Sequence, residues 1–249
     1  MNDQSSIRLG PIHDIQTNIE CIILAGGLGT RLRSSVPDLP KCMAPVAGKP
    51  FLCYVIDYLL EQGVKKFIFS LGYMHEVIAH FLKNNYPSLN FKIALEEEPL
   101  GTGGAILLSC KKATEKNVIV LNGDTLFKAN IEELLDYHVQ HNAACTLSLK
   151  AMQEFDRYGV VTINKDGCIQ SFHEKKYYEN GLINGGVYAL DTEKFQQLHF
   201  DEKFSFEKDY LEKYYTSEKM MGLIQDHYFI DIGIPEDFER AGRELIQSS

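Results

Sequence analysis

Short apolar runs alternate along the first half of this chain with segments whose apolar residues recur at helical spacing. The expected strands are residues 21–25, 66–71, 91–95, 118–121 and 145–150. The expected helices between them are residues 51–62, 76–84, 104–113 and 131–141. This alternation predicts an α/β fold, in which helices cover both faces of a mostly parallel sheet. Ligands of such folds bind outside the carboxyl ends of the strands.

The pattern changes after about residue 151, where strand-like runs follow one another with short connections. Strands are expected at residues 159–163, 168–172 and 183–190, with a hairpin turn at 165–167. Helices are expected at 204–215 and 235–246, and the second begins with a proline, which is favoured at the first helical position. We interpret residues 19–249 as one domain, with a first part at 19–150 and a second at 151–249, and residues 1–18 as an N-terminal extension.

The first expected strand runs directly into a loop that has three glycines between positions 26 and 29. Backbone without Cβ atoms can approach a ligand closely and point its N–H groups at it. Arg31 then adds a rigid cationic fork, and Lys41 adds a mobile point charge. This combination favours a polyanion such as a nucleoside triphosphate, although a tight strand-to-helix turn without a ligand also uses glycines.

Two other glycine loops that bind phosphate do not fit this segment. The P-loop requires a lysine followed by serine or threonine directly after its glycines, and the sequence lacks that pair here. The dinucleotide fingerprint requires a third glycine at the position of Leu32.

Composition excludes several classes of protein. A formal net charge of −9 argues against general nucleic-acid binding, so the cations that meet an anionic substrate must be concentrated locally. The six cysteines show no C-x-x-C spacing, which disfavours a zinc site or redox pair and fits a cytoplasmic protein. The apolar runs are too short to span a membrane, and no membrane partner is expected.

Two aspartates are candidate ligands of a hard cation. Asp124 follows the expected buried strand 118–121 and an Asn-Gly pair, where a carboxylate can bind Mg²⁺ or cap the next segment as a turn residue. Asp231 stands between two isoleucines before a Gly-x-Pro helix start, so we expect it to be largely buried and to need a partner. Its alternative role is to cap the last helix.

Two motifs resemble those of a known family. They are Leu24-Ala25-Gly26-Gly27-Leu28-Gly29-Thr30-Arg31-Leu32 and Pro40-Lys41-Cys42-Met43-Ala44-Pro45. Both are similar to the sugar-nucleotide pyrophosphorylases, the nucleotidyltransferases that activate sugar 1-phosphates. The resemblance extends from about residue 20 to about 245 and implies a three-layer, Rossmann-like (GT-A-like) nucleotidyltransferase fold. In the implied reaction, a sugar 1-phosphate oxygen attacks the α-phosphorus of a nucleoside triphosphate and pyrophosphate leaves.

The same resemblance implies roles for individual residues. The implied catalytic residues are Arg31, Lys41, Lys175 and Asp124, and the implied Mg²⁺ ligands are Asp124 and Asp231. The implied nucleotide contacts are Leu24, Ala25, Gly26, Gly27, Gly29, Thr30, Arg31, Lys41, Glu96, Gly101, Thr102, Gly104, Asn122 and Gly123. The implied sugar-phosphate contacts are Tyr158, Gly159, Glu174, Lys175, Asn184 and Gly185. Without the other motifs, Glu174 and Lys175 would be interpreted as a solvated charge cluster.

Glu96 aligns with the position that reads the base in this family. A carboxylate there can accept both N1–H and N2–H of guanine, whereas uracil and thymine offer one N–H and the ring N3 of cytosine is an acceptor. This argument favours GTP, although Glu97 or Glu98 could be the residue that points inward.

Within the family, the chain looks most like the guanylyltransferases of D-glycero-α-D-manno-heptose 1-phosphate. The expected partners are therefore GTP and a sugar 1-phosphate, in the biosynthesis of a surface polysaccharide, with a homo-oligomer possible. Mannose 1-phosphate guanylyltransferase and a uridylyl- or cytidylyltransferase are the enzymatic alternatives. A non-catalytic nucleotide-sugar sensor is the alternative of another class, and such a protein would be expected to lose a metal ligand or key cation.

Overall fold

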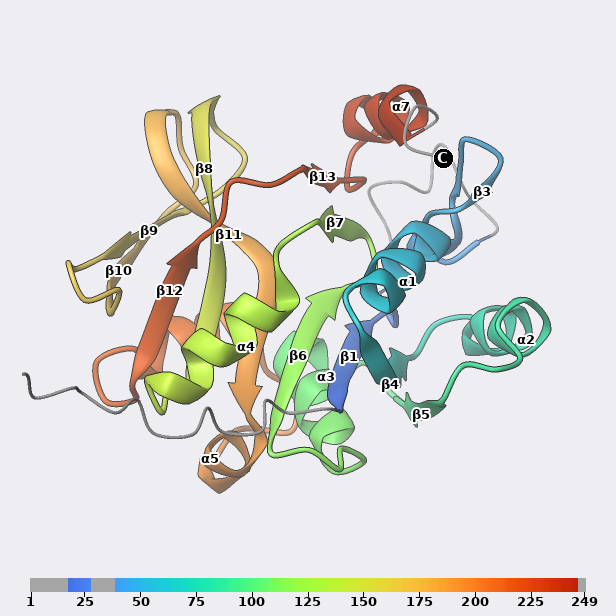
Figure 1. Ribbon diagram of the computed structural model, residues 1–249, viewed down its shortest axis with the longest axis horizontal. Coiled ribbons are helices and arrows are strands. Elements are labelled where there is room, and N and C mark those ends of the chain that lie inside the picture. The colour runs from blue at the N-terminus through green and yellow to red at the C-terminus, as the bar shows by residue number, and fades with distance from the viewer. Residues whose placement is uncertain (1–17, 28–38, 246–249) are drawn as a thin grey trace, which may run out of the picture.

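A nine-stranded mixed sheet forms the centre of the molecule (Figure 1). The computed structural model describes residues 18–27 and 39–245. The strands of the large sheet are β1 (Ile19–Leu24), β4 (Val64–Leu71), β5 (Phe91–Leu95), β6 (Asn117–Asn122), β8 (Cys145–Phe155), β9 (Val160–Ile163), β10 (Ile169–His173), β11 (Tyr178–Asp191) and β12 (Met220–Ile224). Two small sheets pair β2 (Pro45–Val46) with β3 (Lys49–Pro50) and β7 (Thr125–Phe127) with β13 (Phe229–Asp231).

The helices are distributed over both faces of this sheet. They are α1 (Phe51–Glu61), α2 (His75–Asn85), α3 (Gly101–Cys110), α4 (Ile131–Gln140), α5 (Thr192–Gln197), α6 (Glu212–Tyr214) and α7 (Pro235–Glu244), together with a 3-10 helix (Lys41–Met43) and a π-helix (Phe206–Leu211). Among these helices none is long and apolar enough to cross a bilayer.

Strand direction agrees with the expected fold class. The central strands β5, β4, β1 and β6 pair in parallel, as β–α alternation requires. β11 runs antiparallel to β6 and to β8, and β12 pairs in parallel with β8. Most strands of the sheet therefore point the same way, and the predicted α/β fold with a mostly parallel sheet is confirmed.

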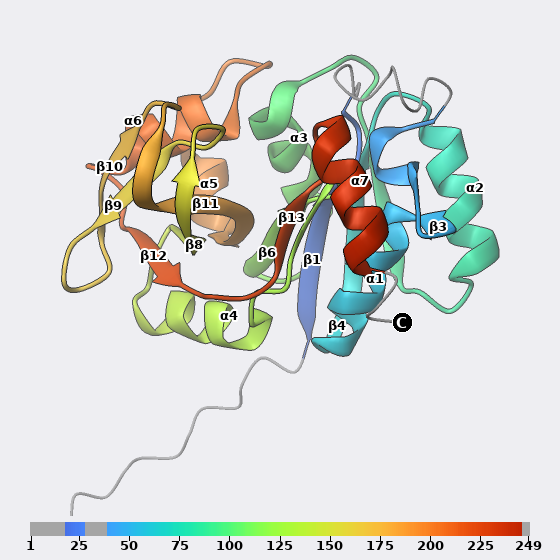
Figure 2. The ribbon, with the colours of Figure 1, turned by 90° about the horizontal axis from the view of Figure 1, so that it is seen from above.

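Side chains of successive strand residues enter two separate cores. In β1, Cys21 and Ile23 pack with α1, α2, α4 and α7, while Ile22 packs on the opposite face with α3, α5 and the π-helix. Figure 2 shows these two helical layers with the central strands between them. Burial of both faces explains why these strands are apolar without alternation in the sequence.

The carboxyl ends of β1, β4 and β6 are joined by backbone hydrogen bonds. Ala25 N–H donates to Ser70 O at 2.9 Å, and Gly123 N–H donates to Leu24 O at 2.8 Å. The glycine loop and the Asn-Gly-Asp segment, about a hundred residues apart, thus meet at one edge of the sheet, as predicted.

Several elements differ from the sequence prediction. β7 and β13 were not expected, because three-residue strands are too short to show a periodic pattern. The expected helix at 204–215 is a π-helix followed by one short α-turn, and β12 and α5 were also missed. The hairpin at 165–167 is confirmed, and Gly167 has a φ of +80° there. Most of the expected extension at 1–18 lies outside the described residues.

Helix α4 buries a histidine in the interior. His138 is 1% exposed, and its Nδ1 lies 2.9 Å from Thr146 Oγ1 on β8, while Nε2 has no hydrogen-bond partner among the described residues. Burial lowers the pKa of His138 to about 4, with a smaller opposing effect of Asp191. The folded protein therefore holds this side chain neutral well below its ordinary range.

We predict that His138 makes stability fall with acidification between about pH 6.5 and 4. In that window the unfolded chain binds a proton on this residue and the folded chain does not, so the free energy of unfolding decreases by about 3 kcal/mol in total. Urea unfolding of wild type and His138→Gln across this pH range measures the effect. The variant should show a smaller pH dependence, and identical slopes would contradict the prediction.

Candidate active site

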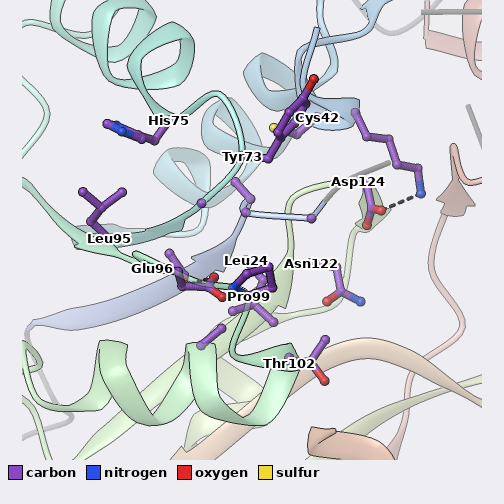
Figure 3. Close-up of a pocket in the computed structure, with 18 of the residues that line it drawn as sticks. Leu24, Cys42, Tyr73, His75, Leu95, Glu96, Pro99, Thr102, Asn122 and Asp124 are labelled. Atoms are coloured by element: carbon purple, nitrogen blue, oxygen red, sulfur yellow. Dashed lines mark hydrogen bonds and ion pairs between the residues drawn. The ribbon is translucent and has the colours of Figure 1, made fainter. Parts of the chain in front are cut away.

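A cavity of about 1040 Å³ opens at the carboxyl edge of the sheet (Figure 3). The glycine loop after β1, the ends of β4 and β6 and the start of α3 surround it. Eleven of the residues predicted to bind nucleotide or metal line it: Leu24, Ala25, Gly26, Gly27, Lys41, Glu96, Gly101, Thr102, Asn122, Asp124 and Asp231. The predicted residues Gly29, Thr30 and Arg31 lie outside the described part of the chain.

The two candidate metal ligands meet because β7 and β13 pair. Asp231 is in register with Thr125, and Ile232 N–H donates to Asp124 O at 3.1 Å. This short antiparallel pair brings two carboxylates that are far apart in the sequence to one end of the cavity. Their side chains are 33% exposed for Asp124 and 24% exposed for Asp231, so both remain accessible.

Lys41 lies between the two carboxylates. Its Nζ is 2.5 Å from Asp124 Oδ2, the dashed contact of Figure 3, and 3.7 Å from Asp231 Oδ1. A Cβ at Gly233 would lie 2.8 Å from Asp231 Oδ1 and 3.2 Å from Lys41 Nζ, so glycine leaves room for this arrangement. The ammonium offsets part of the repulsion between two carboxylates in a partly buried place.

Asp231 does not cap the last helix. Ile234 is the N-cap of α7 and makes no side-chain cap bond, while Asp231 Oδ1 accepts a hydrogen bond from Gly233 N–H at 2.8 Å. Burial raises the pKa of Asp231 above its ordinary value; Lys41 lowers it, and Asp124 raises it further. These surroundings disfavour an unpaired negative charge on Asp231 and favour a carboxylate that is paired with a cation.

The donor set fits Mg²⁺. Carboxylate oxygens are hard ligands, and Mg²⁺ in phosphate-transfer sites is held by one or two carboxylates with substrate phosphates and water. Asp124 and Asp231 would hold the ion together with oxygens of the substrate and water.

Glu96 lies at the opposite end of the cavity from the aspartate pair. Its Oε2 accepts a hydrogen bond from Leu100 N–H at 3.1 Å, and Ser70 Oγ lies 3.4 Å from Oε1. Glu97 and Glu98 also line the cavity, but they are exposed whereas Glu96 is half-buried, so Glu96 is the most enclosed of the three. Burial raises the pKa of Glu96 above its ordinary value, and the Leu100 N–H lowers it.

The glycines at the start of α3 leave room for a neighbouring segment of the protein. A Cβ on Gly103 would collide with the Phe204 ring, and one on Gly104 would lie 2.9 Å from Glu202 O. These two glycines make room for the 202–204 segment. Gly104 and Gly123 are buried outside the cavity lining, whereas Gly101 and Thr102 face it.

The predicted sugar-side residues lie outside the cavity lining: Tyr158, Gly159, Glu174, Lys175, Asn184 and Gly185. Lys175 and Glu174 are exposed in the connection between β10 and β11. Asn184 is held by two hydrogen bonds, from its Nδ2 to Tyr188 OH at 2.9 Å and from Gly186 N–H to its Oδ1 at 3.0 Å. Gly185 packs against the ring of Phe127, so its missing Cβ leaves space for protein.

Sequence reasoning missed several lining residues: Cys42, Ser70, Gly72, Tyr73, His75 and Leu95. Ser70 and Gly72 were detectable, since they stand at the carboxyl end of an expected parallel strand. Leu95 and Tyr73 are each 40% exposed, unusual for large apolar residues, but sequence does not reveal exposure.

Comparisons with known proteins agree with this geometry. Residues 20–248 match the nucleotidyl transferase domain. The chain belongs to the nucleotidyl transferase family. This confirms the family predicted from the glycine-loop and Pro-Lys motifs, and the catalytic domain extends over both halves of the chain.

Individual members of the family are more informative. The chain is 49% identical to D-glycero-alpha-D-manno-heptose 1-phosphate guanylyltransferase of Aneurinibacillus thermoaerophilus, over 91% of this chain and 98% of that protein. It is 30% identical to mannose-1-phosphate guanylyltransferase of Mycobacterium tuberculosis, over 92% of this chain and 65% of that protein. The crystal structure of HddC from Yersinia pseudotuberculosis complexed with GMP-PN has a TM-score of 0.83 and 36% identity, covering 91% of this chain and 99% of that one.

We predict that Lys41→Ala and Asp124→Ala each lower nucleotidyl transfer at least ~10²-fold. Each substitution removes a preorganised charge from the cavity. Release of pyrophosphate under saturating substrates measures the effect. Lys49→Ala is the matched control, since Lys49 pairs with Asp57, 3.0 Å away, outside the cavity. Near-wild-type turnover of the Asp124 variant would contradict the metal-binding role.

Proposed function

We propose that this nucleotidyl transferase transfers GMP from GTP to a sugar 1-phosphate, D-glycero-α-D-manno-heptose 1-phosphate, with release of pyrophosphate. One observation carries the proposal: a single cavity has the Lys41–Asp124–Asp231 cluster at one end and Glu96 at the other. The charged end would bind the triphosphate of a nucleotide, and the polar, half-buried end would bind its base. Similarity to a heptose 1-phosphate guanylyltransferase and to HddC complexed with GMP-PN supports both substrates.

The reaction joins two anions that repel each other, so the protein must mainly position them and offset their charge. Lys41 would shift from its carboxylate partners to the phosphates, because its flexible stem carries a mobile charge. Arg31 would neutralise the leaving pyrophosphate and Lys175 would bind the sugar 1-phosphate. Mg²⁺ held by Asp124 and Asp231 would supply positive charge shared by the two substrates. The attacking phosphate is already ionised at pH 7 and needs no general base.

The sugar would lie on the side of the second half of the chain. Tyr158 and Gly159 lie in the connection between β8 and β9, Asn184 lies in β11, and Glu174 would accept hydrogen bonds from sugar hydroxyls. Asn184 is preorganised by its two hydrogen bonds, which reduces the entropy lost on binding. A cytoplasmic location and a role in surface polysaccharide synthesis are part of this proposal.

The test is a turnover panel. Purified protein is given each of four nucleoside triphosphates with heptose, mannose, glucose or muramate-type 1-phosphates, and pyrophosphate release is measured with Mg²⁺ and after chelation. GTP with the heptose 1-phosphate should be the best pair, and chelation should abolish turnover. Higher activity with mannose 1-phosphate would favour the second candidate, and no activity with any pair would favour a nucleotide-sugar sensor.

Glu96 generates a separate prediction about the base. Inosine triphosphate lacks the N2–H of guanine, so it should react with a kcat/KM lower by about tenfold or more, because a hydrogen bond to a charged acceptor contributes roughly 1.5–3 kcal/mol. In Glu96→Gln the difference between GTP and inosine triphosphate should disappear. Glu61→Gln, at an exposed glutamate of α1 outside the cavity lining, is the control and should retain it. Equal or better activity with UTP or CTP in wild type would contradict guanine recognition.

A further inference from the structure

Arg157 connects the second half of the chain to the carboxylate cluster. It stands between β8 and β9, and its Nη1 forms an ion pair with Asp237 Oδ2 in the first turn of α7. Its other terminal nitrogen, Nη2, lies 3.9 Å from Asp231 Oδ2. One guanidinium thus faces two carboxylates, with the hydrogen bond made to Asp237 and only a longer contact to Asp231.

The position of Arg157 is fixed from a second direction. Its guanidinium lies over the Tyr158 ring, 5.5 Å from the centroid, and that ring meets Phe229 of β13 edge-on at 5.7 Å. Asp237 is well buried for a carboxylate, with a side chain only 14% exposed. The segment 157–158 is therefore held against both β13 and α7, on either side of Asp231.

Asp231 presents its two oxygens differently. Oδ1 accepts from Gly233 N–H and faces Lys41 at 3.7 Å, whereas the described cation facing Oδ2 is Arg157 at 3.9 Å, beyond hydrogen-bond distance. A guanidinium released from Asp237 would close on Oδ2, because a charge-assisted hydrogen bond is stronger than a longer contact. A closed Arg157–Asp231 pair would compete with any cation for that oxygen.

We infer that Asp237 is a positioning residue that holds Arg157 off Asp231 and so keeps Asp231 Oδ2 available to the divalent cation. This inference rests on the proposed function, since that function gives Asp231 its metal. Asp237 is not among the described residues that line the cavity, and its ion pairs are with Arg157 and Arg240, of which Arg157 faces Asp231. Partners of metal ligands commonly affect metal affinity by about 10–100-fold when they are changed.

The experiment measures binding of Mn²⁺ by electron paramagnetic resonance, without nucleotide, to wild type and three variants. Asp237→Asn should bind Mn²⁺ about tenfold more weakly. The double variant Arg157→Gln/Asp237→Asn should regain wild-type affinity, because the competing guanidinium is gone. Arg240→Gln removes another partner of Asp237, 3.3 Å away on the same helix, and should leave Mn²⁺ affinity unchanged.

A crystal structure of Asp237→Asn provides the second measurement. An Arg157 nitrogen should lie within hydrogen-bond distance of Asp231 Oδ2 in that variant. Wild-type Mn²⁺ affinity in Asp237→Asn, no recovery in the double variant, or an unmoved Arg157 would each overturn the inference. Failure of the proposed function is distinguishable, since it would appear as wild-type protein that binds Mn²⁺ normally but releases no pyrophosphate from GTP.

Discussion

The site depends on the pairing of two three-residue strands, β7 and β13. That pairing places Asp124 and Asp231 at one end of the cavity although they are 107 positions apart in the sequence (231 − 124). Two carboxylates in a partly buried place repel each other, so the surrounding chain must supply cations. Lys41 lies between them and Arg157 stands at the far oxygen of Asp231, and each of these cations comes from a different segment of the chain. The arrangement of loops around the cavity follows from this requirement.

The parallel half of the sheet explains why Glu96 and the carboxylate cluster belong to one cavity. Parallel strands end at the same edge, so the segments after β1, β4 and β6 emerge side by side. Glu96 follows β5 at that edge, and its N–H donates to Leu71 O at 2.8 Å, which fixes Glu96 beside the end of β4. The site is therefore built on the ends of rigid strands, which hold side chains more reliably than free loops do.

The sequence predicted what depends on local patterns and short motifs. The central strands, the helices α1 and α4, and the cavity residues Lys41, Glu96 and Asp124 were identified because apolar periodicity and motif spacing are visible in one sequence. The β7–β13 pair and the contacts of Arg157 with Asp237 were not, since they join segments that meet only in the folded chain. Glycines were the most ambiguous signal: Gly104 is a predicted nucleotide contact, yet it is buried outside the cavity lining and a Cβ there would lie 2.9 Å from Glu202 O.

The two ends of the cavity are formed by different segments of the chain. One end of the cavity combines Lys41 with Asp124 and Asp231, whereas Glu96 and the start of α3 form the other end. The predicted sugar contacts lie in β11 and in the connections before β9 and β11, outside the lining of this cavity. The Arg157–Asp237 pair joins those strands to α7 beside Asp231. This pair is therefore a direct structural link between the second half of the chain and the carboxylate cluster.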